Sequence, residues 1–390
     1  MPTFAHRDKC VSSSKPILWR RIITMNERIV TTRNFQEDLV IALSECEHDG
    51  LFVLTDENTA SLCWPVVKDF LCLRKAHLLT IPAGDEQKTI ATATHVWEQL
   101  SQLGATRHSC LINLGGGMVT DLGGFVAATF KRGISFINIP TSLLAMVDAS
   151  TGGKTGVNLG GLKNEVGVFC HPHCVILHTP FLQTLHTQDL LSGYAEMLKH
   201  GLLDSKALWA ETLDWGEQFL STSEERGVGS EACSLLQRSI AVKQRIVEAD
   251  PKEQDIRKAL NLGHTVGHAL ESYSYLSASH PQNATSHITP LKHGYAVAYG
   301  LVCELYLSTM KCGFPTEMLR QAASTIRAYY GEVGITCDDY DALIALMRHD
   351  KKNSLAGINF TLLSAIGDIR INQTANDEEI KEALDFLREG

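Results

Sequence analysis

The chain has 390 residues, a length that suits one large or two ordinary domains. With 44% hydrophobic and 20% charged residues it has the composition of a globular protein, and its formal net charge of -9 gives no reason to expect a nucleic acid partner. No apolar run reaches the roughly 20 residues that span a bilayer, and scattered cysteines without a C-x-x-C pair indicate reduced thiols, so we expect a cytoplasmic protein with no membrane partner.

Residues 1–25 form a basic extension without the apolar stretch of a secretory signal. Two interpretations stay open: the segment is a weak targeting sequence, or translation begins at Met25. We favour the second interpretation and expect the extension to be disordered or dispensable.

Residues 26–186 alternate between strand-like and helix-like segments. Short apolar runs predict strands at 51–55, 77–81, 110–114, 134–139 and 174–177. Helix-like segments such as 90–103 lie between most of them. Apolar strands separated by helices favour an α/β domain whose parallel sheet is covered on both faces.

Residues 187–390 are expected to form a second, mainly α-helical domain. Helical periodicity appears at 189–203, 231–249, 257–273 and 293–310. Only 357–363 has the pattern of a late strand. The polar segment 277–290 is interpreted as a flexible or lid-like loop.

A glycine-rich turn follows the predicted strand 110–114, in "LINLGGGMVTDLGG". It is not the G-x-G-x-x-G dinucleotide motif with its distant acidic residue. A strand, a glycine turn and a helix nevertheless suit a pyrophosphate, because backbone N–H groups and the positive helix end face the anion. Tight packing of helix on sheet explains these glycines equally well.

A second glycine-rich stretch, "VDASTGGKTGVN" at 147–158, almost matches a phosphate-binding P-loop. Asp148 occupies the position of the first glycine, which argues against an NTPase. What remains is Lys154 in a flexible turn, followed by Lys163 and Asn164. These residues indicate either a site for an anionic substrate or a solvated surface loop.

A candidate metal site begins in "NLGHTVGHALES", where His264 and His268 stand four residues apart on one helical face. Glu196 and His293, on other predicted helices, supply further donors. One carboxylate and two histidines suit catalytic zinc. The plain alternative is a surface or core histidine pair.

The segment "CHPHC" at 170–174 also has the residue types of a zinc site. A structural zinc finger needs a second cluster at a defined spacing, and the sequence has none. We therefore interpret this segment as the entry to a strand with buried cysteines.

Several of these segments together resemble the 3-dehydroquinate synthase family, a group of sugar-phosphate cyclases. The resemblance extends from Asp56 to Asn353 and rests on motifs in family order: "PAGDEQKT", "GGGMVTDLGGFVAATFKRG", "IPTSLLAMVDASTGGKTGVN", "GLKNEVG", "SGYAEMLKHG", "RKALNLGHTVGHALE", "KHGYAVAYG" and "DKKN". Each motif is modest alone, but the ordered set is specific. It implies a nucleotide-binding α/β domain followed by a helical metal-binding domain, with the active site between them.

The resemblance also implies a role for each matching residue. The metal, Zn²⁺ or Co²⁺, would be held by Glu196, His264 and His293. The NAD contacts would be Asp56, Asp85, Lys88, Gly117, Met118, Val119, Thr120, Asp121, Thr141, Ser142, Lys154, Lys163, Phe181, Leu182, Gln183 and Thr184. The substrate and the chemistry would be served by Arg132, Asp148, Lys154, Asn164, Lys199, Lys243, Arg257, Asn261, His268 and Lys351.

The implied substrate is 3-deoxy-arabino-heptulosonate 7-phosphate, an anionic sugar phosphate with a carboxylate. In the family reaction NAD oxidises the sugar, phosphate is eliminated, the hydride returns and the ring closes to 3-dehydroquinate. Many basic groups are needed because the substrate carries two anionic groups. A homodimer is the expected assembly.

The chain departs from the family pattern at three positions. Tyr295 replaces a common glutamate beside a metal ligand, Thr151 replaces an aliphatic residue, and Ser142 replaces threonine. None of these changes removes a ligand or an anion-binding lysine. The alternatives are another sugar-phosphate cyclase, a metal-dependent alcohol or glycerol dehydrogenase, or a metal-bound protein without catalysis.

Overall fold

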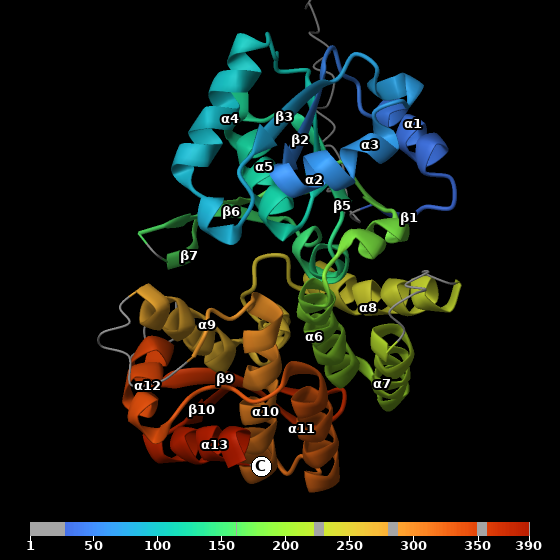
Figure 1. The fold of residues 1–390 in the computed structure, drawn as a ribbon. Coiled ribbons are helices and arrows are strands. Elements are labelled where there is room, and N and C mark those ends of the chain that lie inside the picture. Colours follow the sequence, from blue (N-terminus) through green and yellow to red (C-terminus); the bar gives the residue numbers. More distant parts are fainter. Residues whose placement is uncertain (1–27, 161, 222–229, 280–287, 349–356, 390) are drawn as a thin grey trace, which may run out of the picture.

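The computed structural model describes residues 28–160, 162–221, 230–279, 288–348 and 357–389. The predicted extension at 1–25, most of the loop at 277–290 and Lys351 lie outside these residues. Figure 1 shows two halves stacked one above the other, with the sheet in the upper half and most of the later helices below. Within the described part of the chain, no helix is long and apolar enough to cross a membrane.

The upper half contains a six-stranded parallel sheet in the order β1-β8-β5-β4-β2-β3. Its strands are β1 (Ile29–Thr31), β2 (Leu51–Asp56), β3 (His77–Ile81), β4 (Cys110–Gly115), β5 (Ser135–Pro140) and β8 (Cys174–Leu177). The five predicted strands are confirmed within one residue. The edge strand β1 was missed because three residues are too short for a visible pattern.

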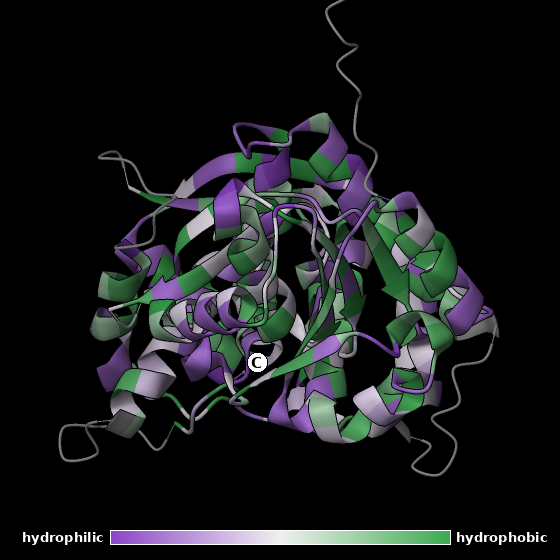
Figure 2. Ribbon diagram, turned by 90° about the horizontal axis from the view of Figure 1, so that it is seen from above, coloured by the Kyte–Doolittle hydropathy of each residue, from purple (hydrophilic) through white to green (hydrophobic). Residues whose placement is uncertain are grey.

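Helices cover both faces of this sheet, as predicted. They are α1 (Phe35–Glu45), α2 (Glu57–Leu62), α3 (Trp64–Val67), α4 (Ile90–Gln102) and α5 (Gly117–Thr129). Successive strand residues enter different cores: Leu111 belongs to the apolar cluster that includes residues of α4 and α5, whereas Ile112 belongs to the cluster that includes residues of α1 and α3. Figure 2 shows the mainly hydrophobic strands between these layers.

The lower half is mainly helical, as predicted. Its helices are α6 (Thr187–Asp204), α7 (Lys206–Ser221), α8 (Ser230–Ala249), α9 (His264–Ser279), α10 (His293–Cys312), α11 (Thr316–Tyr330), α12 (Tyr340–Arg348) and α13 (Asp377–Glu389). The predicted late strand is β9 (Ile358–Ala365), but it pairs with a second strand, β10 (Asp368–Ala375), which the sequence did not reveal. The burial of β10 alternates between exposed and intermediate, and Ile369 and Ala375 on its less exposed face pack against the core.

Two sequence interpretations near the site are wrong. The segment 257–273 is not one helix: a 3-10 helix (Ile256–Asn261) ends before Gly263, whose φ of 79° breaks the path, and α9 begins at His264. Lys154 and Lys163 do not lie in a flexible loop. They belong to β6 (Lys154–Leu159) and β7 (Leu162–Phe169), an antiparallel hairpin between the two halves.

Shorter helical segments connect the main elements. A π-helical turn (Ala145–Ala149) leads from β5 toward the second glycine-rich stretch. The remaining 3-10 helices are Leu71–Leu73, Asp85–Gln87, Phe130–Arg132, Thr179–Thr184 and Cys337–Asp339. The "CHPHC" segment leads into β8, and Cys174 is buried as expected, but Cys170 is partly exposed.

Candidate active site

Three helices of the lower half bring one carboxylate and two imidazoles together. Glu196 comes from the middle of α6, whereas His264 and His293 are the first residues of α9 and α10. Nε2 of His264 lies 3.4 Å from Oε1 of Glu196, and Nε2 of His293 lies 3.5 Å from the same oxygen. The predicted metal ligands are thus adjacent, with donor atoms within 4.8 Å of one another.

Glycines permit the close approach of the two helices that begin with the histidines. A Cβ atom at Gly300 of α10 would lie 2.0 Å from the carbonyl oxygen of Gly263, immediately before α9. A Cβ atom at Gly294 would lie 2.0 Å from the carbonyl oxygen of Ser192 on α6. Any larger residue would push the helices apart, so these glycines set the distance between the three donors.

The other ring nitrogen of each histidine is engaged. Nδ1 of His264 lies 3.1 Å from the carbonyl oxygen of Leu262, and Nδ1 of His293 lies 3.2 Å from Oε2 of Glu271. Both contacts turn Nε2 toward Glu196, as occurs for metal-ligating histidines. Oε1 of Glu196 is buried and has no hydrogen-bond partner among the described residues. A cation would satisfy this oxygen, so the donor set fits a divalent metal.

The electrostatics of the cluster also suit a metal. Burial lowers the pKa of His264 to about 3, assisted by the positive charge of Lys199, so this imidazole is neutral and able to ligate. Burial opposes ionisation of Glu196, but the positive charge of Lys199 holds its pKa well below the usual range. For His293, burial favours the neutral ring, yet the Glu271 carboxylate raises its pKa to about 10. A metal would replace that proton.

Buried cations surround this cluster. Lys199 pairs with Oε2 of Glu196, and Nζ of Lys243 lies 2.9 Å from Oδ1 of Asp148. Although burial disfavours its charged form, the carboxylates of Glu196 and Asp148 raise the pKa of Lys199. A Cβ at Gly152 would lie 3.1 Å from Nη2 of Arg257 and 3.4 Å from Cε of Lys243. The structure therefore brings these predicted substrate residues together around the second glycine-rich stretch.

The side chain of Arg257 is buried and fixed by several contacts. Only 1% of its surface is exposed, and its guanidinium donates to the carbonyl oxygens of Pro251 and Gly152 at 2.7 and 2.9 Å. It also stacks over the ring of Phe169, 5.5 Å from the ring centre. In this conformation Arg257 joins the hairpin to the lower half.

Sequence reasoning missed Glu253, which joins two predicted substrate residues. Its Oε2 lies 2.5 Å from Nζ of Lys154, and its Oε1 accepts a hydrogen bond of 2.9 Å from Asn261. Glu253 has a φ of 58°, a left-handed conformation that is uncommon for glutamate. No local pattern marks this residue, because its partners come from β6 and from the following 3-10 helix.

His200 was also missed. It lies on α6 one turn after Glu196, its Nδ1 contacts Oγ of Ser239 at 2.8 Å, and its Nε2 is buried without a hydrogen-bond partner among the described residues. Asp148, Glu196 and His200 form a second group of possible metal donors. Glu196 is common to both groups, but Asp148 is already paired with Lys243, so the second group suits a metal less well than the first.

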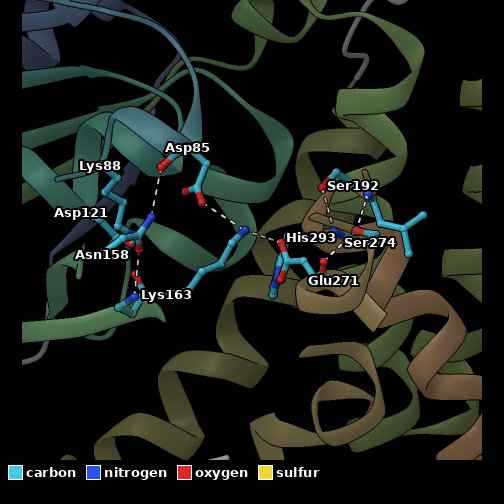
Figure 3. A network of polar contacts seen from close by, with 12 residues as sticks. Asp85, Lys88, Asp121, Asn158, Lys163, Ser192, Glu271, Ser274 and His293 are labelled. Carbon is cyan, nitrogen blue, oxygen red and sulfur yellow. Dashed lines mark hydrogen bonds and ion pairs between the residues drawn. The ribbon is translucent and has the colours of Figure 1, made fainter. Parts of the chain in front are cut away.

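The first glycine turn lies at the carboxyl end of β4, where α5 begins at Gly117 without a side-chain cap. Nζ of Lys88 lies 2.6 Å from Oδ2 of Asp121, one turn into α5. Asp85 precedes Lys88 and pairs with Lys163 of the hairpin at 3.0 Å. Figure 3 shows these residues on the side that faces α9. Open N–H groups at a helix start suit an anion such as a pyrophosphate.

The glycines of the first turn differ in how tightly they are packed. A Cβ at Gly123 would lie 2.0 Å from Oδ1 of buried Asn113, so this glycine is required for packing. A Cβ at Gly117 would lie 3.2 Å from Cβ of Ala149, which leaves it less restricted. Gly117 is also partly exposed, as are Met118 and Asp121, whereas Val119 and Thr120 are buried.

Several residues that were predicted to contact the nucleotide make hydrogen bonds or core contacts within the protein. Oδ1 of Asp56 caps α2 by accepting the N–H of Thr59 at 2.7 Å. Phe181 and Leu182 belong to the hydrophobic core, and Thr184 donates to the carbonyl of Phe181 at 2.7 Å. Among the other predicted nucleotide contacts, Thr141 is buried, Ser142 lies beside Gly116, and Gln183 is exposed.

The structure does not bring Arg132 to the cluster. It is exposed, has a φ of 69°, and follows α5 just before β5 begins. This turn lies at the amino-terminal ends of the parallel strands, whereas the glycine turn lies at their carboxyl-terminal ends.

Tyr295 packs edge-on against Tyr330, with ring centres 5.0 Å apart. His268 does reach the site, with its ring centre 5.2 Å from that of His264.

Solved structures with the same fold contain both cyclases and dehydrogenases. A 2-epi-5-epi-valiolone synthase from Streptomyces hygroscopicus subsp. jinggangensis, solved with NAD⁺ and Zn²⁺ bound, has a TM-score of 0.80 at 22% identity, covering 98% of this chain and 99% of that one. A 2-deoxy-scyllo-inosose synthase, complexed with carbaglucose-6-phosphate, NAD⁺ and Co²⁺, has a TM-score of 0.72 at 24% identity, covering 93% and 96%. Glycerol dehydrogenase from Schizosaccharomyces pombe has a TM-score of 0.61 at 15% identity, covering 93% and 88%. The fold is that of the sugar-phosphate cyclases and related dehydrogenases.

Sequence comparison identifies the family within this class. Residues 78–192 match the family model for the 3-dehydroquinate synthase N-terminal part, and 193–353 match that for the C-terminal part. A 3-dehydroquinate synthase from Parabacteroides distasonis is 49% identical over 93% of this chain and 98% of its own length. Another from Pyrococcus furiosus is 36% identical over 89% and 93%. The chain belongs to the 3-dehydroquinate synthase family.

Proposed function

We propose that this enzyme converts 3-deoxy-D-arabino-heptulosonate 7-phosphate to 3-dehydroquinate and phosphate, as a carbon–oxygen lyase that uses NAD catalytically. The observation that carries the proposal is the position of buried cations beside the Glu196–His264–His293 cluster. Family membership supports the same substrate and reaction. Dimerisation and a cytoplasmic location stay predictions.

Two bound groups would supply chemistry that amino acids lack. Zn²⁺ or Co²⁺ on Glu196, His264 and His293 would act as a Lewis acid toward a substrate oxygen, and NAD at the first glycine turn would accept and return a hydride. The protein would orient both groups. Leu262 and Glu271 fix the two imidazoles. The start of α5 offers backbone N–H groups at the carboxyl end of β4.

The cationic side chains would bind and stabilise the anionic substrate. Lys199 and Lys243 are 1% and 7% exposed, so their charges act in an environment that screens them weakly. Lys154 is more exposed and would provide a charge at the entrance of the site. Such fixed charges lower the energy of an elimination in which negative charge moves onto the departing phosphate.

This cation set argues against a simple dehydrogenase. Hydride transfer to or from a neutral alcohol needs the nucleotide turn and the metal cluster, but it does not need several buried lysines. A phosphate lyase without redox chemistry would need the lysines but not the nucleotide turn. The overall reaction of a 3-dehydroquinate synthase uses all three features together.

The decisive experiment follows phosphate release and NADH absorbance in one cuvette, with purified metal-loaded protein and NAD far below the heptulosonate phosphate. We expect many phosphates per NAD, no net NADH, and 3-dehydroquinate as product. Accumulation of NADH in proportion to product would indicate a dehydrogenase. Turnover of sedoheptulose 7-phosphate but not of the heptulosonate would indicate another cyclase.

A further inference from the structure

Glu271 is a buried carboxylate that contacts both halves of the protein. It lies on α9, on the same face as His264 and His268, and is 2% exposed. Its Oε2 lies 3.2 Å from Nδ1 of His293, and its Oε1 lies 2.5 Å from Nζ of Lys163. Both carboxylate oxygens are therefore used, one toward the metal cluster and one toward the hairpin.

The contact with His293 fixes the ring of a metal ligand. A carboxylate at Nδ1 favours the tautomer in which Nδ1 carries the hydrogen and Nε2 keeps its lone pair. Nε2 of His293 then faces Oε1 of Glu196 at 3.5 Å. Without Glu271 the imidazole could rotate or place its hydrogen on the wrong nitrogen.

The contact with Lys163 connects this ligand to the nucleotide-binding half. The same ammonium lies 3.0 Å from Oδ2 of Asp85 and 5.3 Å from the ring centre of Tyr275, one turn after Glu271. Asn158, on the other strand of the hairpin, donates to the carbonyl of Asp85 at 3.1 Å. Figure 3 shows Lys163 extending from the hairpin between Asp85 and Glu271.

We propose that Glu271 is a positioning residue that couples the β6–β7 hairpin to the metal centre. Lys163 holds the Glu271 carboxylate in the orientation that fixes His293. Metal binding and docking of the hairpin on α9 therefore stabilise each other, and this coupling acts equally in both directions. The inference rests on the proposed metal site at Glu196, His264 and His293.

The test measures the Zn²⁺ affinity of metal-free protein by competition with a chelator, without NAD or substrate. Glu271→Gln should weaken Zn²⁺ binding about 10- to 100-fold. Lys163→Met should weaken it by a smaller factor, and Lys163→Arg should restore most of the loss. The double variant should bind Zn²⁺ no more weakly than Glu271→Gln, because both changes break one connected contact. Glu317→Gln removes an exposed carboxylate on α11 and should have no effect.

Three results would overturn the inference: unchanged affinity in Glu271→Gln, unchanged affinity in Lys163→Met, or additive losses in the double variant. Because Lys163 is 35% exposed, its substitution tests the coupling even if Glu271→Gln fails to fold. The Co²⁺ absorption spectrum of Glu271→Gln should also differ from that of the unsubstituted protein. If His264→Ala binds Zn²⁺ like the unsubstituted protein, the proposed metal site itself is wrong, which is a separate outcome.

Discussion

The carboxylate of Glu304 accepts the backbone N–H of Thr265 at 2.9 Å, and its other oxygen accepts the N–H of Gly263 at 2.7 Å. These two amides flank His264, the first residue of α9. Glu304 belongs to α10, the helix that begins with His293. One ligand helix thus caps the start of the other, and the negative carboxylate also favours the positive end of α9.

This cap leads to a prediction for Glu304→Gln. The neutral amide cannot accept both N–H groups as a carboxylate does, so the free energy of unfolding of the metal-free protein should fall by about 1.5–3 kcal/mol. Urea unfolding at pH 7.5 measures the change. Glu332→Gln, on the exposed segment after α11, should leave the unfolding free energy unchanged. Equal stability of the two variants would show that the cap contributes little.

A second prediction concerns metal content. His264→Ala and His293→Ala should each lose stoichiometric zinc and turnover, because two protein donors are too few to hold the ion tightly. Elemental analysis after dialysis gives the stoichiometry. Cys170→Ser should keep both zinc and turnover, since no residue of the "CHPHC" segment belongs to a group of possible metal donors in the described part of the chain. Full zinc in either histidine variant would contradict the assignment of that ligand.

A third prediction separates substrate binding from nucleotide binding. Lys243→Met should lower kcat/KM for the sugar phosphate about 10- to 100-fold, because a charge-assisted contact in a buried site contributes about 1.5–3 kcal/mol. The Kd for NAD should change less than twofold, since Lys243 pairs with Asp148 and not with the first glycine turn. Steady-state kinetics and fluorescence titration measure the two effects. A weaker NAD complex with normal kcat/KM would place Lys243 at the cofactor instead.

The fourth prediction is a dependence of stability on pH. Burial lowers the pKa of His178 to about 4, and its ring stacks on Phe35 with centres 4.4 Å apart. Below pH 6.5 the unfolded chain takes up a proton that the folded chain does not, so the unfolding free energy falls as pH falls from 6.5 toward 4. Between pH 7.5 and 5.0 this residue accounts for a loss of at most about 2 kcal/mol.

The His178→Gln variant should therefore lose less stability than the unsubstituted protein over that pH interval, as measured by urea unfolding of metal-free samples. His95→Gln changes an exposed histidine on α4 and should show the same pH dependence as the unsubstituted protein. Identical curves for all three proteins would mean that His178 binds its proton equally in both states.

The sequence by itself determined most strands of the parallel sheet, the helical character of the second half and the chemical groups of the metal cluster. Continuous apolar runs predicted the strands, and the four-residue spacing of His264 and His268 predicted the helical face that carries them. These are local features, because the period of burial along a segment follows from its own backbone geometry. Glu196 and His293 were candidate donors from their residue types, the family motifs implied the same ligand set, and the structure joins both histidines to Glu196.

The tertiary structure decided which groups meet. Glu253 and Glu304 lie outside every quoted motif, and Glu271 ends a motif in which the sequence assigned it no role. Each of the three nevertheless contacts a residue on another element: Lys154, Lys163 or Thr265. Arg132 lies in a conspicuous motif, but the direction of α5 carries it to the amino-terminal ends of the strands, away from the first glycine turn. Contacts between residues far apart in the chain depend on how helices and strands pack, and a buried carboxylate is stable only where that packing supplies donors or cations.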